Sequence, residues 1–194
     1  MKTSNYILIT IFILVIASIL TLYITSKRHE SFSVHRTEIS LPNTIHVIVA
    51  ESNTNIIVNG NDKNSILLDD QIKEQEVYRI SADTLFLNVT KYSPIILLNH
   101  SVSIIGQENN MITISDYKAN KLTVQKTGGN LWMSSNVIDT LQIKATDRAT
   151  VFLLDKNQID YLSADMKNGS SFNFTKYNKI GKLNVEGIVP NIND

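Results

Sequence analysis

The sequence predicts an all-β protein, a parallel β-helix (β-solenoid) of about five short coils, with an N-terminal strand region and one transmembrane helix before it. Three observations lead to this prediction. Units of about twenty residues repeat along the second half of the chain, short apolar alternations fill the first half, and an uncharged stretch precedes both.

The uncharged stretch runs between Lys2 and Lys27 and contains YILITIFILVIASILTLYIT, residues Tyr6–Thr25. A helix of about 20 residues spans about 30 Å, the thickness of a hydrocarbon core. Tyr6 and Tyr23 lie near the two ends, where aromatic rings favour the membrane interface. We therefore expect an uncleaved single-pass anchor with the N-terminus inside. A cleaved signal peptide is the alternative, although the usual small-residue cleavage site is missing.

Four regions are expected along the chain. They are an anchor at 1–27, a stalk or linker at 28–40 that could begin a first strand, an N-terminal β region at 41–98, and the coils with the C-terminal end at 99–194. In the third region, runs such as IHVIV and LFLNV are separated by Asn, Asp, Gly and Ser, which is typical of short strands joined by turns.

The repeat begins with a leading apolar residue in each unit. The leaders are Val102, Leu122, Leu141, Leu162 and Leu183, with gaps of 20, 19, 21 and 21. A second apolar alternation follows in four of the five units, after turn residues such as Gly128-Gly129 and Asn168-Gly169. A fixed period of this length indicates units that bury their apolar side only by stacking on their neighbours.

A leucine-rich repeat shares the period but needs a Leu-x-x-Leu-x-Leu framework, which is absent. A sandwich or meander with coincidental spacing is the remaining alternative. The last unit, from Ile180 onward, is expected to lack its second strand, with Pro190 and polar residues ending the stack.

The order of these segments carries a family resemblance. Strands of the type TIHVIVAESNTNIIVNGNDKNSILL, then VYRISADTLFLNV, then coils such as ITISDYKANKLTVQKTGGNLWM resemble the auto-transporter adhesin head GIN domain family of bacterial envelope proteins, over roughly Ile39 to Gly187. The resemblance implies a right-handed β-helix on the extracytoplasmic side of the envelope and an adhesive role. It implies no active-site residues.

Composition excludes several functional classes. The chain has no cysteine, so it has no disulfide, thiolate metal site or cysteine nucleophile. Its net charge is zero and it lacks a basic block, which argues against a nucleic-acid partner. The four histidines, His29, His35, His46 and His100, are scattered without ligand spacing, so we expect no metal and no cofactor.

Trp132 is the residue that the sequence singles out as a candidate for ligand binding. It lies between Leu131 and Met133, which are expected to point inward, so its ring is expected to point outward. Tyr117, Tyr161 and Tyr177 also lie near coil edges. Exposed aromatic rings on a β-helix can stack on sugars or anchor a protein partner. The alternative is that Trp132 packs under a neighbouring loop.

Equivalent positions in successive coils are expected to form ladders. One ladder contains Asn120, Asp139, Asp160 and Gly181. Two neighbouring carboxylates can bind a cation or work as an acid/base pair, but Asn, Asp and Gly are also ordinary turn residues. We favour turns and expect no catalytic residue. A second ladder places Lys144 beside Asp165 as an exposed ion pair.

These observations predict a non-catalytic, membrane-anchored domain outside the cytoplasm, in the periplasm or on the cell surface, with a binding, adhesion or structural role. Its partners would be the membrane, through the anchor, and a protein or polysaccharide ligand. Two alternatives stay open. One is a β-helical polysaccharide lyase or hydrolase that uses Asp139 and Asp160, and the other is a regulatory or sensing protein of the envelope.

Overall fold

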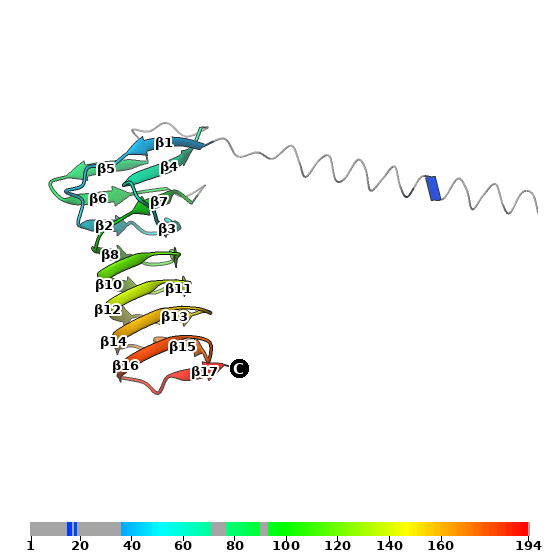
Figure 1. The fold of residues 1–194 in the computed structure, drawn as a ribbon, viewed down its shortest axis with the longest axis vertical. Coiled ribbons are helices and arrows are strands. Elements are labelled where there is room, and N and C mark those ends of the chain that lie inside the picture. The colour runs from blue at the N-terminus through cyan, green and yellow to red at the C-terminus, as the bar shows by residue number, and fades with distance from the viewer. Residues whose placement is uncertain (1–14, 17, 19–35, 71–76, 90–92, 194) are drawn as a thin grey trace, which may run out of the picture. The chain divides into compact units, whose positions relative to one another are not determined.

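The computed structural model describes residues 15, 16, 18, 36–70, 77–89 and 93–193 (Figure 1). The chain divides into two units, Met1–His35 and Arg36–Asp194, and the strands of the described residues all belong to the second.

Two sheets form the walls of the second unit, one of nine strands (sheet A) and one of eight (sheet B) (Figure 1). In spatial order, sheet A contains β1 (Arg36–Ser40), β4 (Ser65–Asp69), β7 (Ile95–Leu98), β3 (Ile56–Gly60), β9 (Met111–Ser115), β11 (Asn130–Ser134), β13 (Thr150–Leu153), β15 (Ser171–Thr175) and β17 (Asn191–Asn193). Sheet B contains β16 (Lys179–Glu186), β14 (Gln158–Met166), β12 (Val137–Thr146), β10 (Lys118–Thr127), β8 (Val102–Gly106), β2 (Val47–Ala50), β6 (Thr84–Leu87) and β5 (Tyr78–Ser81).

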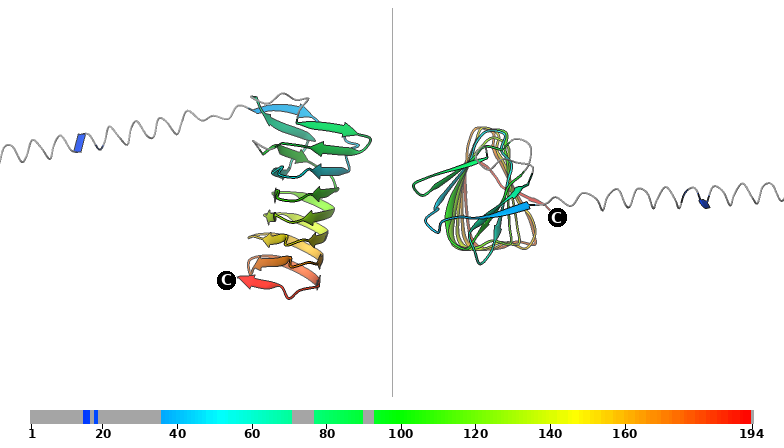
Figure 2. Two further views of the ribbon diagram at one scale, coloured as in Figure 1. Left: turned by 180° about the vertical axis from the view of Figure 1, so that it is seen from behind. Right: turned by 90° about the horizontal axis from the view of Figure 1, so that it is seen from above.

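The β-solenoid predicted from the repeat is confirmed. From β8 to β17 the chain alternates between the sheets, and each strand pairs in parallel with the equivalent strand of the next turn. The five leading residues lie opposite one another in the predicted register: Val102, Leu122, Leu141, Leu162 and Leu183. Viewed along the stack, these turns overlie one another (Figure 2, right).

The apolar alternation explains this arrangement. Every second side chain of a strand points into the narrow space between the sheets, where Leu122, Leu141 and Leu162 are fully buried. The turns between the sheets need left-handed backbone, and the predicted turn residues Gly128, Gly129 and Asn168 have positive φ. Each turn of chain therefore covers the apolar edge of the one before it.

The N-terminal strands join the same two sheets in an unexpected order. β6 and β7 stack on β2 and β3, which in turn stack on β8 and β9. The chain thus moves one turn away from the later coils and then crosses back to begin β8. At this end of the stack the pairing is antiparallel: β1 pairs with β4, β4 with β7, and β5 with β6. The regular repeat predicts none of this, because it begins only at Val102.

The predicted fold class needs one correction, since the expected transmembrane helix is not found. Within the described residues no helix is long and apolar enough to cross a membrane, and the elements from Arg36 onward are strands. Most of Tyr6–Thr25 lies outside those residues. An apolar run of this length makes a membrane span a candidate, but hydropathy alone does not establish one. The fold class is an all-β solenoid.

Two further expectations change at the ends. Residues 36–40, placed in the stalk or at the start of a first strand, form β1 against β4. The last unit was expected to lack a second strand, but β17 pairs in parallel with β15 after Pro190. Proline is compatible with the residue before a strand, since its missing N–H is then not required by the ladder.

An internal asparagine ladder (Asn136, Asn157 and Asn178) fixes the corner between the end of sheet A and the start of sheet B. The Nδ2 of Asn136 donates to the Oδ1 of Asn157 at 2.8 Å, and the Nδ2 of Asn157 donates to the Oδ1 of Asn178 at 2.8 Å. The same Nδ2 groups also donate to the carbonyls of Ile114 and Met133. Because Asn136 and Asn157 are fully buried, these hydrogen bonds satisfy groups that water cannot reach.

Replacing Asn157 by alanine is expected to lower the free energy of unfolding by about 2–4 kcal/mol, since it leaves several buried donors and acceptors without partners. Urea unfolding followed by far-ultraviolet circular dichroism measures this. Asn120→Ala, at an exposed asparagine of the same solenoid, is the control and should change stability by less than about 0.5 kcal/mol. Equal losses in the two variants would contradict a structural role for the ladder.

Candidate functional site

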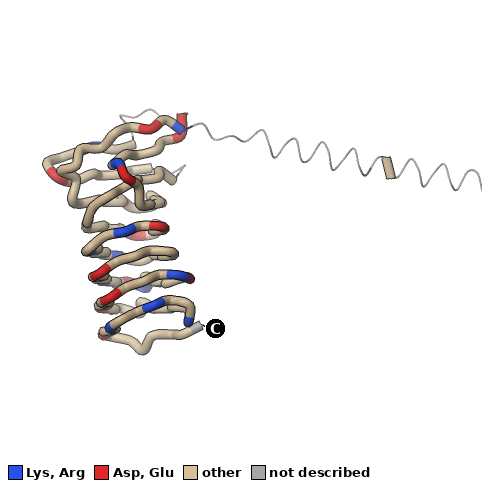
Figure 3. The backbone as a smooth tube through the Cα atoms, viewed as in Figure 1, with Lys and Arg blue, Asp and Glu red and all other residues tan. Residues whose placement is uncertain are grey.

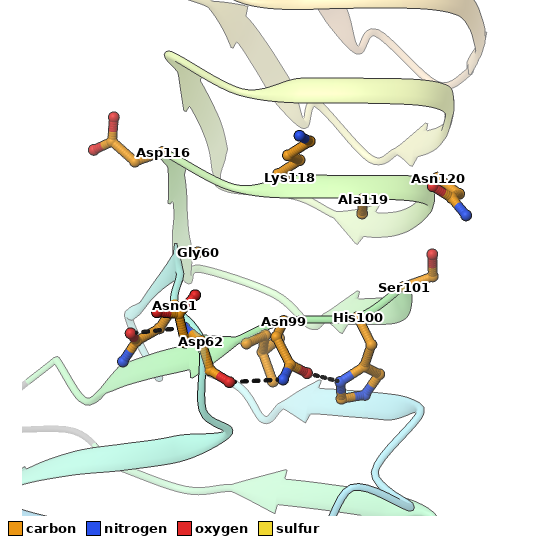
Figure 4. Close-up of a pocket in the computed structure, with 11 residues that line it drawn as sticks. Gly60, Asn61, Asp62, Asn99, His100, Ser101, Asp116, Lys118, Ala119 and Asn120 are labelled. Carbon is orange, nitrogen blue, oxygen red and sulfur yellow. Dashed lines mark hydrogen bonds between the residues drawn. The ribbon is translucent and has the colours of Figure 1, made fainter.

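A cleft of about 710 Å³ lies where the chain crosses from β7 back to β8 (Figure 4). Its polar lining comes from three segments that are distant in sequence. The lining residues are Gly60, Asn61, Asp62, Leu98, Asn99, His100, Ser101, Asp116, Lys118, Ala119 and Asn120.

Hydrogen bonds hold Asn99 and His100, which lie in the segment that crosses from β7 to β8. Asn99 donates from its backbone N–H to Asn64 Oδ1 at 3.1 Å. Its Nδ2 donates to the carbonyl of Asp62 at 2.9 Å (Figure 4). The two ring nitrogens of His100 lie 3.2 Å from Asn99 Oδ1 and 2.5 Å from the carbonyl oxygen of Ile45. These side chains therefore fix the crossing segment, which forms one wall of the cleft.

Tyr117 closes the crossing from inside the solenoid. It is fully buried, its hydroxyl donates to the carbonyl of His100, and its backbone N–H donates to Asn136 Oδ1. Burial raises the pKa of the Tyr117 hydroxyl, which stays a neutral donor. The expectation that Tyr117 is an exposed aromatic at a coil edge is therefore wrong, because its side chain points inward from the turn.

His46 and His100 lie side by side, which sequence reasoning missed. Their ring centroids are 5.6 Å apart and the rings are perpendicular. His46 is exposed, as its place in the strand alternation predicts. The pair forms only because β8 stacks on β2, which brings residues 46 and 100 together. Across the described part of the chain, no group of three or more His, Cys, Asp or Glu is arranged to hold a metal ion.

Trp132 does not line the cleft but lies on the outer face of sheet A. Trp132 is 40 % exposed, while Leu131 and Met133 on either side are buried, so the predicted outward orientation is confirmed. It lies in register with Thr113 on β9 and Phe152 on β13. The rings of Trp132 and Phe152 meet edge to face with centroids 6.0 Å apart. This contact holds Trp132 while leaving much of its ring open to solvent.

The carboxylates of Asp139 and Asp160 lie at the predicted ladder position. Their neighbours pair in register, Ile138 with Ile159 and Thr140 with Tyr161, and both aspartates are exposed. At the next equivalent position, a Cβ on Gly181 would lie 2.7 Å from the carbonyl oxygen of Asp160. Backbones that approach this closely favour small and turn-forming residues, which supports the interpretation of this ladder as a corner.

The second predicted ladder has a different ion pair. Lys144 and Asp165 are in register, but Asp165 pairs with Lys167 at 2.8 Å, two residues along its own chain. The hydrogen bond and charge of Asp165 raise the pKa of Lys167. Register places side chains side by side, but it does not decide which of two nearby lysines a carboxylate binds.

Lys126 is a buried lysine at an inward position, where the next two turns have Ala145 and Met166. It is 1 % exposed, and its Nζ donates to the carbonyls of Gln107 and Gly128. Burial lowers the pKa of Lys126 to about 8. A deprotonated lysine can act as a nucleophile, but this one is enclosed by the solenoid and bonds to turn carbonyls. It therefore stabilises the corner near Gly128.

Comparisons with family models, with curated proteins and with solved structures found no match for this chain. The features described above are therefore the grounds for a functional proposal.

The titration of Lys126 predicts a pH dependence of stability. Its pKa is about 8 in the folded chain against 10.5 for a free lysine, so between these values the unfolded chain binds more protons. The free energy of unfolding should therefore rise as the pH increases from about 8 toward 10.5, by roughly 3 kcal/mol at most for this group.

Urea unfolding at several pH values between about 7.5 and 10, for the wild type and Lys126→Met, measures this contribution. The upper limit reduces the ionisation of Tyr117 in the unfolded chain. Because burial raises the pKa of Tyr117 in the folded chain, that ionisation would lower the free energy of unfolding at pH values above the ordinary value of 10.0. The variant should lack the lysine-dependent rise. If both proteins show the same pH dependence, Lys126 is not a buried titrating group.

Proposed function

We propose that this β-solenoid is a non-catalytic binding module, with a role in adhesion or in the structure of the cell envelope. The observation that supports it best is the outward, partly exposed ring of Trp132, held against Phe152 on a flat sheet face. Aromatic rings of this kind bind sugars or protein side chains at little cost in conformational entropy.

The shape of the described unit also suits binding rather than turnover. The stacked strands give a rigid surface, and the carboxylates of Asp139 and Asp160 are exposed at a corner rather than enclosed in the cleft. A catalytic acid usually requires a partly desolvated environment that raises its pKa. An adhesive role is also what the resemblance to the GIN domain family implies.

We propose further that the module works outside the cytoplasm. The uncharged N-terminal sequence between Lys2 and Lys27 is the type of segment that directs a chain to an export pathway. The absence of cysteine also leaves the fold independent of the redox state of its compartment. Protease accessibility of a C-terminal tag, on intact cells and after the outer barrier is opened, tests this location. Protection in both states would contradict it.

The binding role predicts that Trp132→Ala weakens retention of the full chain on its ligand by at least roughly tenfold. Arrays of polysaccharides and of envelope proteins supply the ligands, and Trp132→Phe should keep part of the affinity. Tyr177→Ala, at an exposed aromatic that follows β15 outside sheet A, is the matched control and should bind like the wild type. Unchanged retention of Trp132→Ala on every bound ligand rules out this surface as the binding site.

The same polysaccharides should remain intact. Release of new reducing ends or unsaturated products on incubation, abolished by Asp160→Asn, would instead establish a lyase or hydrolase at the exposed carboxylates.

A further inference from the structure

The outer face of sheet A carries no charged side chain from β3 to β15, five neighbouring strands that the structure describes completely. The outward side chains on these strands are Ile57, Asn59, Met111, Thr113, Ser115, Asn130, Trp132, Ser134, Thr150, Phe152, Ser171, Asn173 and Thr175. We call this surface the neutral face.

Most of sheet B differs from the neutral face. In sheet B, charged side chains point outward on β10, β12, β14 and β16 and on β5, whereas β8, β2 and β6 between them carry none. Figure 3 shows acidic and basic residues along the length of the stack. These charges include Arg79, Lys121, Lys144, Asp165, Lys182 and Glu186. A solvated face of a small protein normally carries such charges, so a sheet face without them is a distinctive surface.

The neutral face has a mainly apolar column at its centre, in which Thr113 is the one polar member. Ile57, Thr113, Trp132 and Phe152 lie in register on four neighbouring strands, at about 4.8 Å per strand. The column therefore runs along the stack, perpendicular to the strands. Trp132 is the most exposed member, and Phe152 supports it edge to face.

Hydrogen-bonding side chains flank this column on both sides. Asn130, Thr150 and Ser171 form one row, in register on β11, β13 and β15. Ser115 and Ser134 are in register in the other row, where Ser115 also donates to Asn59 Oδ1 at 2.8 Å. The arrangement is an apolar centre with uncharged donors and acceptors at its margins.

From this geometry we propose that the neutral face binds an uncharged glycan chain that lies along the stack, with a sugar ring on Trp132. A pyranose ring has an apolar C–H face, which stacks on an aromatic ring, and hydroxyl groups around its rim, which hydrogen bond to amides and hydroxyls. An acidic glycan or a nucleic acid would lose the solvation of its charges here without gaining a cationic partner. This inference rests on the proposed binding function and specifies its ligand.

The protein has a single tryptophan, so its fluorescence reports directly on this site. The full chain, in a detergent without a sugar headgroup, is titrated with cellohexaose, laminarihexaose, mannohexaose and hexagalacturonate. At least one neutral hexasaccharide should shift the emission to shorter wavelength, saturably, and shield Trp132 from iodide quenching. Hexagalacturonate should bind more weakly. Raising the salt concentration should leave the neutral affinity unchanged, because no charge is paired.

Phe152→Ala retains the reporter and should weaken the affinity by roughly tenfold, since it removes the ring that supports Trp132. Tyr177→Ala should match the wild type. Near-ultraviolet circular dichroism of Phe152→Ala shows whether the variant remains folded, and Phe152→Leu is the milder substitution if it does not.

The inference is overturned if none of the neutral hexasaccharides changes the emission, or if hexagalacturonate binds more tightly than they do. Binding of an acidic glycan or a protein that depends on Trp132 would overturn this inference and leave the proposed function standing. Binding that persists unchanged in Trp132→Ala, measured by affinity electrophoresis, would rule out this surface and overturn the inference, whereas the absence of any bound polysaccharide or protein would count against the proposed function itself.

Discussion

The parallel stacking of one turn of chain on the next is the interaction on which the rest of this structure depends. Each turn presents short strands whose inward side chains are buried only when another turn covers them, so no turn is stable alone. The asparagine ladder makes the stacking specific, because the amide of each residue bonds to the equivalent amide of the next turn. Hydrophobic burial alone would tolerate sliding, whereas these buried amides are satisfied in one register.

The same stacking produces the candidate functional surfaces. In-register strands repeat each outward position at the strand spacing, which converts alternate residues of separate strands into straight rows. This places Trp132 against Phe152 and surrounds them with Asn, Ser and Thr side chains. The cleft has a different origin, since it forms where the chain reverses its direction of stacking and crosses back to β8. Function is therefore proposed for features that the regular repeat creates, while the main irregularity of the stack creates the cleft.

The sequence predicts the regular half of the fold well, because periodicity is a local property. The leaders from Val102 to Leu183, the outward ring of Trp132 and the turns at Gly128 and Asn168 all follow from it. The 21-residue spacing of Asn136, Asn157 and Asn178 was a further signal in the sequence that the apolar pattern obscured. The inward direction of Tyr117 and Lys126 was not predicted, since an aromatic or charged residue at a turn is usually solvated.

Non-local contacts account for most of what the sequence could not predict. The order of the N-terminal turns and the contact of His46 with His100 depend on which strands meet across tens of residues, and no local pattern encodes that choice.

The central claim is that the strands of the neutral face are stacked in register, and a cysteine cross-link tests it directly because the chain contains no native cysteine. Ser115 and Ser134 are in register on neighbouring strands, at a spacing of about 4.8 Å that a disulfide can bridge. Mild oxidation of Ser115→Cys/Ser134→Cys should give an intramolecular disulfide, detected by mass spectrometry, whereas Ser115→Cys/Thr175→Cys, three strands apart in the sheet, should remain reduced. Cross-linking of the distant pair, with the adjacent pair left reduced, would contradict this account.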